Sequence, residues 1–396
     1  MKIGIVKRAE SYWSLQEFTK QAISALGEKY NISIADHSEM QSADFVDRFY
    51  SKVDIVIHIS SKMIDYHRHP LKPTIFLAHA WMDQAAGFGY FLKKECFSSS
   101  DAFCFTSSSA AAKFRDAFNT NIQIAKLPYF STISMQNSYN VKSKYGLPLD
   151  RPILLYFGRL CSEKNIEGLI DIYKQVKNQQ AILVIAGAFS PIKTFGYCGK
   201  ETITHYEKKI RKLIKVSIKP VFLLESISRT DLMSLLAQSY LSLNPTICLE
   251  EDFGLSAVES MAVGVPVVAS RWGGLKDIVR HGKTGYLFDV DLGSSRAATN
   301  NEAAAKYIDH LLSLPALRAH MSANSRIRAK RYFSKTAFVR TVSQLISKLG
   351  LKEEPLILEP KPWIKPIYEK TRVEKSADTI YDNNPNLFTR LYGHYL

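Results

Sequence analysis

Residues 251–274 read EDFGLSAVESMAVGVPVVASRWGG and predict a turn, a helix and a buried strand in succession. The helix is expected to end at Gly264, and the strand follows it as PVVA. Asp252 is suited to cap the helix, which would leave the backbone N–H groups of residues 253–256 pointing outward with the positive end of the helix dipole. A helix start of this kind binds anions. The order turn, helix, strand is typical of an α/β fold with a parallel sheet.

Two carboxylates, Glu251 and Glu259, flank this helix start eight positions apart. A carboxylate accepts two hydrogen bonds, which suits the vicinal hydroxyls of a sugar ring. One glutamate can therefore hold a hexose while the other holds a ribose. Taken singly, two glutamates near a helix start are more often simple partners of the helix dipole.

A second informative stretch lies about a hundred residues upstream. Residues 153–157 form an apolar strand run that leads into GRLCSEKN and then a helical pattern. Gly158 allows close backbone approach, Arg159 offers a fork of donors for phosphate oxygens, and Lys164 adds a point charge. Each cation alone would read as a solvated surface charge. Together, the two stretches indicate a site for a nucleoside diphosphate sugar.

These residues resemble the retaining nucleotide-sugar glycosyltransferases of the GT-B fold, family four, which carry a G-R-L-x-x-E-K-N turn and an E-x(7)-E motif. The resemblance covers most of residues 1–345. It implies two doubly wound Rossmann-like α/β domains that face each other across a cleft. It also implies that Arg159 and Lys164 bind the donor diphosphate, that Glu251 faces the transferred sugar and that Glu259 holds the nucleotide ribose. Glu250 has the same chemistry, but only Glu251 keeps the motif's spacing.

The resemblance extends to further donor-site residues. Phe253, Gly254 and Leu255 would present the helix start to the donor. His79 stands where the family often has a histidine facing the sugar, although a lone histidine at a strand end is more often structural. The pair Gly273-Gly274 resembles a glycine pair that borders the donor pocket in the family, and an ordinary turn is the alternative.

The reaction implied is glycosyl transfer with retention of configuration, in which the leaving phosphate itself takes the acceptor proton. The cations and the helix start would stabilise the departing phosphate, a role that a metal plays in other transferases. We therefore expect no cofactor and no metal. The acceptor is expected to be a glycan, a lipid-linked molecule, a protein or a small molecule.

Composition agrees with an enzyme of two domains. The chain has 396 residues with 46% hydrophobic content, which is ample for two cores. Its five cysteines are scattered, which fits reduced thiols in a cytoplasmic protein. The N-terminus has too short an apolar core for a signal peptide, and no apolar run reaches bilayer length.

The net charge is +15, and +12 of it lies in residues 151–350. The basic runs at 208–219 and 326–335 are either solvated helix faces or surfaces that attract anionic donors or an anionic membrane. A peripheral contact with the inner face of the membrane is thus one expectation. Nucleic acid ranks lowest as a partner because no nucleic-acid module is visible.

Alternating strand and helix patterns predict the domain organisation. With the resemblance, they imply that residues 1–148 form an acceptor domain, residues 149–335 the donor-binding domain, and residues 336–350 a helix that crosses back to the first domain. The tail at 351–396 is rich in proline and aromatic residues, so we expect it to be ordered and to pack on the body.

The N-terminal half departs from the family. Many relatives have a glycine-rich loop after the first strand, whereas residues 7–13 here read KRAESYW. Lys7 or Arg8 could still meet a phosphate or an acidic acceptor. After Ala186-Gly187, a long segment (residues 189–204) replaces the family's short acidic turn.

Two other classes of protein are alternatives. A dinucleotide-dependent oxidoreductase needs G-x-G-x-x-G after a strand. Neither the strand at residues 3–6 nor the strand at residues 153–157 leads into that pattern. A catalytically inactive glycan-binding or scaffolding protein is harder to exclude, given the altered first loop and the tail. Joint retention of the four charged donor residues argues against it.

Overall fold

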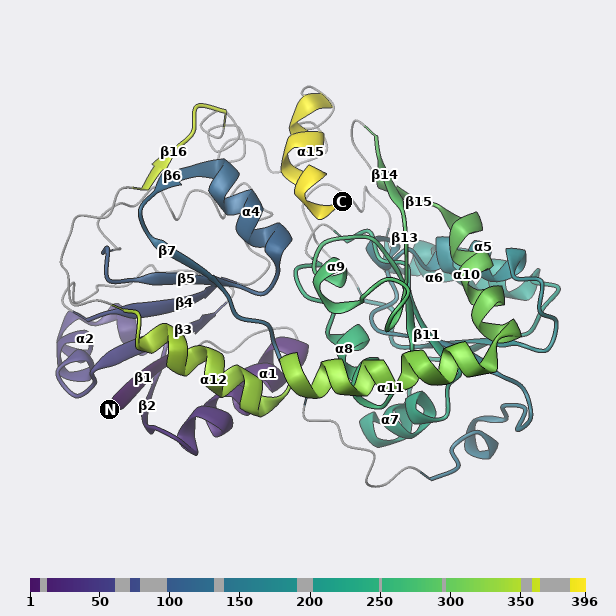
Figure 1. The fold of residues 1–396 in the computed structure, drawn as a ribbon, viewed down its shortest axis with the longest axis horizontal. Coiled ribbons are helices and arrows are strands. Elements are labelled where there is room, and N and C mark those ends of the chain that lie inside the picture. Colours follow the sequence, from purple (N-terminus) through teal and green to yellow (C-terminus); the bar gives the residue numbers. More distant parts are fainter. Residues whose placement is uncertain are drawn as a thin grey trace. The chain divides into compact units, whose positions relative to one another are not determined.

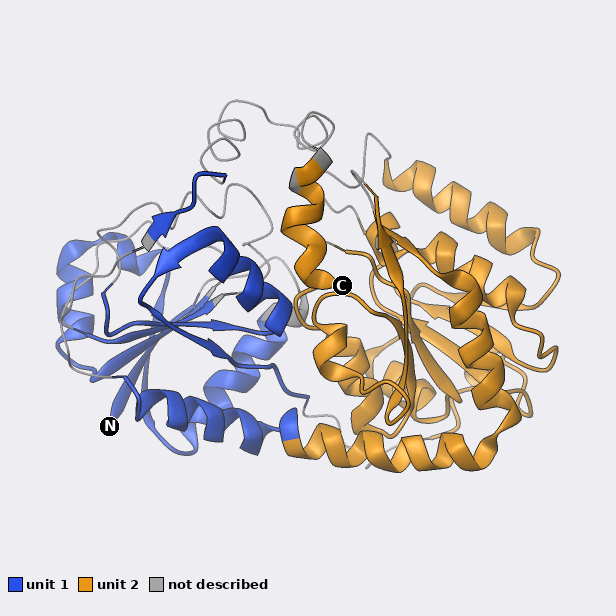
Figure 2. Cartoon of the chain, turned by 45° about the horizontal axis from the view of Figure 1, so that its top comes forward, with its two compact units in different colours: residues 1–132, 332–375 blue, residues 133–331, 376–396 orange. Residues whose placement is uncertain are grey.

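The computed structural model of the 396-residue chain describes residues 1–7, 13–60, 72–78, 98–131, 139–190, 202–248, 251–293, 297–349, 358–363 and 385–396. The chain forms two compact units (Figure 2). Unit 1 consists of residues 1–132 and 332–375, and unit 2 consists of residues 133–331 and 376–396. Each unit contains a six-stranded sheet flanked by helices (Figure 1).

The sheet of unit 1 is parallel throughout, with the strand order β2-β1-β3-β4-β5-β7. This is a doubly wound order of the flavodoxin type. The alternation of strands and helices predicted for this half is confirmed. The strands are β1 (Lys2–Lys7), β2 (Asn31–Asp36), β3 (Ile55–Ser60), β4 (Thr74–Ala78), β5 (Ala102–Phe105) and β7 (Gln123–Lys126).

The first helix of unit 1, α1, and the helix at residues 335–346 pack on this sheet through a shared apolar core. Phe18 of the first helix meets Phe338 of the last one edge to face, with ring centroids 5.7 Å apart. Residues 335–346 therefore belong to the core of unit 1, although they follow unit 2 in the sequence. The helices are α1 (Trp13–Gly27), η1 (Glu39–Gln41), α2 (Ala43–Tyr50), α4 (Ser108–Ala117) and α12 (Lys335–Ile346).

The sheet of unit 2 is also parallel, with the order β10-β9-β8-β11-β12-β13. Numbered along the chain, this is the 3-2-1-4-5-6 order of dinucleotide-binding folds. The strands predicted at residues 153–157 and 266–269 are confirmed as β8 and β12. The strands are β8 (Ile153–Phe157), β9 (Ile182–Ala186), β10 (Val221–Leu224), β11 (Leu241–Asn244), β12 (Val267–Ser270) and β13 (Gly285–Phe288).

Alternating side chains of β8 enter the cores on the two faces of this sheet. Leu154 and Tyr156 join one cluster, and Ile153, Leu155 and Phe157 join the other. Burial on both faces explains why these strands read as continuous apolar runs. The remaining elements of unit 2 are η4 (Ser143–Tyr145), η5 (Ser162–Lys164), α5 (Ile166–Gln175), α6 (Ile203–Lys215), α7 (Arg229–Ala237), α8 (Leu255–Ala262), α9 (Leu275–Ile278), β14 (Val290–Leu292), β15 (Ala297–Thr299), α10 (Asn301–Ser313) and α11 (Pro315–Tyr332).

The segment before β8 belongs to unit 2, whereas the sequence analysis placed the domain boundary at residue 148. Asp231 of α7 explains this grouping, because it is buried and accepts hydrogen bonds from this segment. Lys144 donates to Asp231 at 2.8 Å and Tyr145 at 2.7 Å, and Tyr139 donates to it as well.

The described parts of the tail pack on the body. Strand β16 (Leu358–Pro360) pairs antiparallel with β6 (Phe118–Thr120), and Trp363 donates its indole N–H to the carbonyl of Asp116 at 3.3 Å. The helix α15 (Pro385–Tyr392) and the turn η6 (Gly393–Tyr395) close the chain within unit 2.

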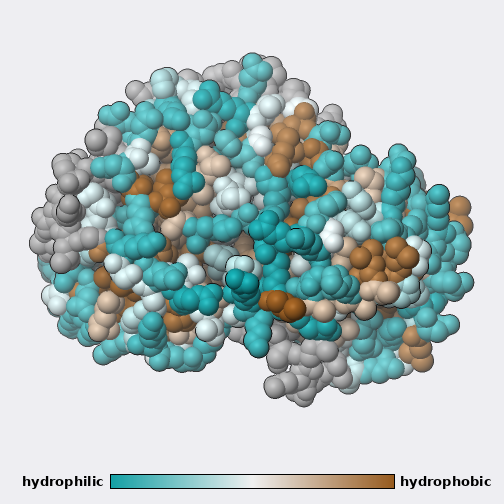
Figure 3. Space-filling view, viewed as in Figure 1, coloured by the Kyte–Doolittle hydropathy of each residue, from teal (hydrophilic) through white to brown (hydrophobic). Residues whose placement is uncertain are grey.

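None of the described helices is both long enough and apolar enough to cross a bilayer. On the face shown in Figure 3, hydrophobic side chains form separate small patches among hydrophilic ones.

Candidate functional site

The predicted donor residues lie at the point where the sheet of unit 2 changes its winding direction. Strands β8 and β11 are neighbours, but the chain leaves β8 toward β9 and leaves β11 toward β12. The loops after these two strands therefore diverge at the carboxyl ends, and doubly wound sheets bind ligands in the crevice at such a point. The two predicted motifs supply these two loops.

The loop after β8 is shaped by its own side chains. Gly158 ends the strand, and the hydroxyl of Tyr156 donates to the carbonyl of Arg159 at 2.7 Å. Asn165 caps α5 by accepting from the N–H of Gly168 at 3.2 Å.

Asn165 also ties this loop to its neighbour. Its side-chain amide donates to the carbonyl of Pro245, just after β11, at 3.2 Å, and to the hydroxyl of Thr299 at 3.0 Å. The asparagine of the first motif thus fixes the two loops to each other, a role that the sequence analysis did not give it.

Lys164 and Glu251, one from each motif, form an ion pair across the crevice. Only 16% of the lysine side chain and 10% of the glutamate side chain are exposed. Burial alone would lower the pKa of Lys164, but the charge of Glu251 outweighs it and raises the pKa above 10.5. The structure therefore brings together the residue predicted to hold phosphate and the one predicted to face the sugar.

Glu259 pairs with Arg229, the first residue of α7. A second guanidinium nitrogen of Arg229 lies 3.4 Å from the other carboxylate oxygen, so the contact is two-pronged. Glu259 is 5% exposed, and this burial raises its pKa while Arg229 opposes the rise. Sequence reasoning missed Arg229, because a single arginine after the N-cap Ser228 has no distinctive spacing.

The start of α8 corrects one prediction. The helix begins at Leu255 with Gly254 as its N-cap, in a left-handed conformation at φ 95°. No described side chain caps this end. Asp252 is not the cap, because its buried carboxylate accepts a hydrogen bond from Tyr395 at 2.6 Å. Phe253 is buried beside Gly254, so the predicted helix start is present, displaced by two residues.

The glycine pair at 273–274 packs against the loop that carries Glu251. A side chain at Gly273 would approach the carbonyl oxygen of Glu251 to 2.2 Å, and one at Gly274 would approach that of Asp252 to 2.3 Å. The N–H of Gly274 donates to the Glu251 carbonyl at 2.8 Å. Both glycines are therefore needed for the close approach of two loops.

Several of the predicted residues are not placed in this site. His79, Glu250 and Arg8 lie outside the described residues, and no role of theirs is tested. Lys7 pairs with Asp36 at 2.9 Å, at the ends of neighbouring strands. Among the described residues, no group of three His, Cys, Asp or Glu side chains lies close enough to hold a metal ion.

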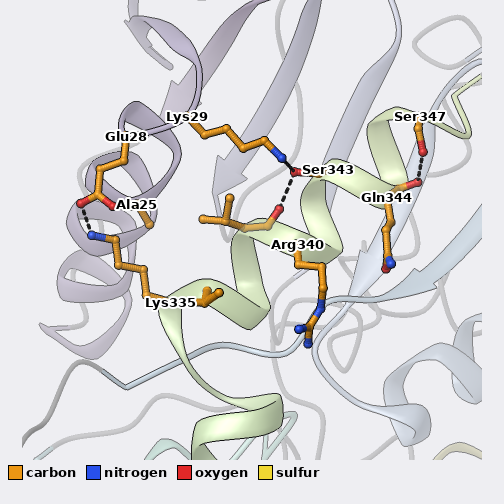
Figure 4. Close-up of a pocket in the computed structure, with 10 residues that line it drawn as sticks. Ala25, Glu28, Lys29, Lys335, Arg340, Ser343, Gln344 and Ser347 are labelled. Atoms are coloured by element: carbon orange, nitrogen blue, oxygen red, sulfur yellow. Dashed lines mark hydrogen bonds and ion pairs between the residues drawn. The ribbon is translucent and has the colours of Figure 1, made fainter.

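A groove of about 500 Å³ lies within unit 1, between α1 and α12 (Figure 4). Lys335 pairs with Glu28 across it, and Lys29 donates to Ser343 at 2.8 Å. None of the described donor-site residues lines this groove. It is thus separate from the crevice of unit 2.

Comparison with known proteins finds a family match over the region that carries both motifs. Residues 138–328 match the family described as Glycosyl transferases group 1. The match covers just under half of the chain, and we call residues 138–328 the group 1 domain after this similarity. The group 1 domain contains every described donor-site residue predicted above, together with Arg229. Membership of family four and retention of configuration stay predictions.

Two curated relatives illustrate the reach of the similarity. The chain is 27% identical over 151 residues to N-acetyl-alpha-D-glucosaminyl L-malate synthase of Bacillus anthracis, covering 38% of this chain and 35% of that protein. It is 26% identical over 263 residues to alpha-1,3/1,6-mannosyltransferase ALG2 of Homo sapiens, covering 63% and 59%. The chain thus spans less than two thirds of the length of either relative.

Solved structures establish the fold. Anabaena Alr3699/HepE in complex with UDP-glucose superposes with a TM-score of 0.65 at 17% identity, over 88% of this chain and 99% of that one. Sucrose-phosphate synthase from Thermosynechococcus elongatus gives a TM-score of 0.62 over the same shares. The fold of this chain is GT-B, as predicted.

Proposed function

We propose that the protein is a retaining glycosyltransferase, which moves a sugar from a nucleoside diphosphate sugar to a glycan or lipid-linked acceptor. The observation that carries the proposal is the pairing of Lys164 with Glu251, beside the pairing of Arg229 with Glu259, at the winding reversal of unit 2. Two carboxylates with different cationic partners at a helix start suit a ligand that has both anionic and polyhydroxyl parts. The named relatives that act on or bind sugars support the same class.

In this proposal the donor diphosphate takes Lys164 as a partner, with Arg159 and the N–H groups at the start of α8. A phosphate oxygen competes with Glu251 for the ammonium group. Release of Glu251 from Lys164 then leaves its carboxylate facing the sugar. Glu259 holds the ribose hydroxyls, with Arg229 fixing its orientation.

The charge that develops on the leaving phosphate is met by Lys164 and Arg159, both of which stay protonated at neutral pH. The leaving phosphate accepts the proton of the acceptor hydroxyl on the same face of the sugar, which gives retention. We propose that no divalent metal is required, so turnover should persist in EDTA.

The α6 face suggests a further partner. Lys208, Lys212 and Lys215 are exposed along this helix, and Val216 and Ile218 follow it with 62% and 101% of their surface exposed. A basic face that ends in exposed aliphatic side chains suits an anionic membrane surface. We propose that the protein meets the cytoplasmic face of a membrane here, where a lipid-linked acceptor would be found.

A ligand screen followed by substitution tests the donor site. Thermal-shift measurements with UDP, GDP, ADP and their sugars identify the nucleotide, since a ligand at a hundred times its Kd stabilises by about 2.7 kcal/mol. Arg159→Ala and Lys164→Ala should each weaken calorimetric affinity for that nucleoside diphosphate by about 1.5–3 kcal/mol. The control is Lys174→Ala, since Lys174 pairs with Asp171 at 3.1 Å on an exposed part of α5.

Unchanged affinity in both donor-site variants would remove the assignment. Tight binding of the nucleotide sugar by the wild type, without hydrolysis or transfer, would favour the catalytically inactive glycan-binding protein instead.

A further inference from the structure

The last twelve residues of the chain pack on unit 2 beside the loop that carries Glu251. Figures 1 and 2 show this terminal segment with the C-terminus at its end. Four of its large side chains are almost fully buried, with at most 3% of their surface exposed. They are Phe388, Leu391, Tyr392 and Tyr395. Burial of large side chains of this kind stabilises the docking of the segment.

Three polar contacts fix this end of the tail to unit 2. The hydroxyl of Tyr395 donates to the carboxylate of Asp252 at 2.6 Å. The backbone N–H of Gly273 donates to the carbonyl of Tyr395 at 2.9 Å, and the ammonium of Lys276 donates to the carbonyl of His394 at 2.9 Å. The end of the tail thus contacts two segments of unit 2, the loop that contains Asp252 and the turn that contains Gly273.

Trp272 connects the tail to the same loop. It is fully buried, and its ring centroid lies 5.2 Å from that of Tyr395 and 6.4 Å from that of Tyr392. Its indole N–H donates to the carbonyl of Cys248 at 2.8 Å.

The Glu251 loop is therefore held from three directions. Trp272 holds Cys248, Gly274 donates to the carbonyl of Glu251, and Tyr395 holds the side chain of Asp252. Only the last of these comes from outside the group 1 domain. A side chain at Gly273 would meet the Tyr395 ring at 2.8 Å, so the turn is shaped to admit the tail.

We infer that the C-terminal residues 385–396 position Glu251 for catalysis, with Tyr395 as the positioning residue. The inference rests on the proposed function. Tyr395 acts through Asp252, the residue next to Glu251, and touches neither donor nor acceptor in this account. The extension beyond the family domain is thus a component of the donor site.

The test separates turnover from nucleotide binding. In full-length Tyr395→Phe the ring stays buried and only the hydroxyl is lost. We expect kcat for the nucleotide sugar found in the screen, measured as transfer or donor hydrolysis, to fall about tenfold or more, because small displacements of catalytic groups are costly. Calorimetric affinity for the nucleoside diphosphate alone should stay within about twofold, because Arg159, Lys164 and Glu259 remain in place.

The matched control is Tyr173→Phe. Tyr173 is also fully buried in unit 2, and its hydroxyl donates to the carbonyls of Ala181 and Pro220 at 2.9 and 3.0 Å, at the amino ends of β9 and β10. It should lower the melting temperature without changing kcat. A second variant, Lys276→Met, loosens the tail from another contact and should lower kcat in the same direction as Tyr395→Phe.

Each outcome decides the inference. Wild-type kcat in both Tyr395→Phe and Lys276→Met would overturn it, as would equal losses of kcat and nucleotide affinity, which indicate general damage to the site. An equal loss of kcat in Tyr173→Phe would also overturn it, because the loss in Tyr395→Phe would then reflect lower stability rather than the position of Glu251. If the wild type turns over no nucleotide sugar, the proposed function fails first and this inference fails with it. A kcat loss confined to the tail variants supports it.

Discussion

The two glutamates of the E-x(7)-E motif look alike in the sequence, but they have different partners in the fold. Glu251 pairs with Lys164, which the donor diphosphate is proposed to claim. Glu259 pairs with Arg229, which lies on a different helix and is not proposed to move. The first carboxylate is therefore free to respond to the donor, and the second is fixed before the donor arrives.

This difference predicts separate kinetic defects. Contacts of Glu259 with the ribose are the same in the ground and transition states, so Glu259→Gln should mainly raise the donor KM. Glu251 faces a sugar ring that gains positive charge as its bond to phosphate breaks. Glu251→Gln should therefore lower kcat by a hundredfold or more, on the order of 3 kcal/mol.

Steady-state kinetics of both variants check this assignment. The reverse pattern, or effects on KM alone in both, would take the catalytic role from Glu251 and reopen Glu250 as the candidate. The isosteric glutamine keeps the shape of each side chain, so the comparison reports charge rather than packing.

At the scale of elements, local pattern predicted most strands, and contacts distant in sequence decided the exceptions. The apolar runs of β8 and β9 are unambiguous because both faces of the sheet are buried. Asp252 looked like a helix cap, yet its carboxylate is bound by Tyr395, 143 positions away. No local signal reports such a contact.

The same reason explains what was missed in the site. Arg229 meets Glu259 across 30 positions, and Asn165 meets Thr299 across 134. Both contacts join segments that the sheet of unit 2 brings together. The charged residues of the two motifs were predictable from their spacing in the sequence. The residues that orient them, such as Arg229, were not.

The docked tail predicts a specific pH dependence of stability. Burial raises the pKa of Tyr395 well above 10, and the charges of Asp252, Tyr392 and Cys248 add to the rise. A raised pKa means that the stability contributed by the neutral phenol is complete below pH 10, where tyrosine is neutral in the unfolded chain as well. This stability is lost as pH rises further, because the unfolded chain releases a proton that the folded chain retains.

Urea unfolding of the wild type and Tyr395→Phe at pH 8 and pH 11 measures this contribution. At pH 8 the variant should be less stable by about 1.5–3 kcal/mol, the value of a hydrogen bond to a charged group. At pH 11 the difference in unfolding free energy between the two proteins should be smaller by about 1.4 kcal/mol. Other buried tyrosines cancel in the difference between the two proteins, so a constant gap would contradict the docking of a neutral Tyr395.

At the scale of the whole molecule, the excess positive charge needs a physical role. Of the net +15, +12 lies in residues 151–350, which contain the proposed donor site. The donor crevice needs only a few cations, two of which are already paired with glutamates. The exposed Lys208, Lys212 and Lys215 of α6 are not among these donor-site cations, and they precede the exposed Val216 and Ile218 in the sequence.

We therefore predict binding to vesicles that contain anionic lipid and little binding to zwitterionic ones. Each basic residue near such a surface contributes about 1 kcal/mol, so the double variant Lys212→Glu/Lys215→Glu should bind roughly thirtyfold more weakly or worse. High salt should have the same effect on the wild type, since screening shortens the reach of surface charge. The double variant Lys174→Glu/Lys177→Glu is the control, because it makes the same change of charge at exposed positions around the end of α5. Cosedimentation that falls equally in both double variants would show that net charge, rather than the α6 face, directs the protein to lipid.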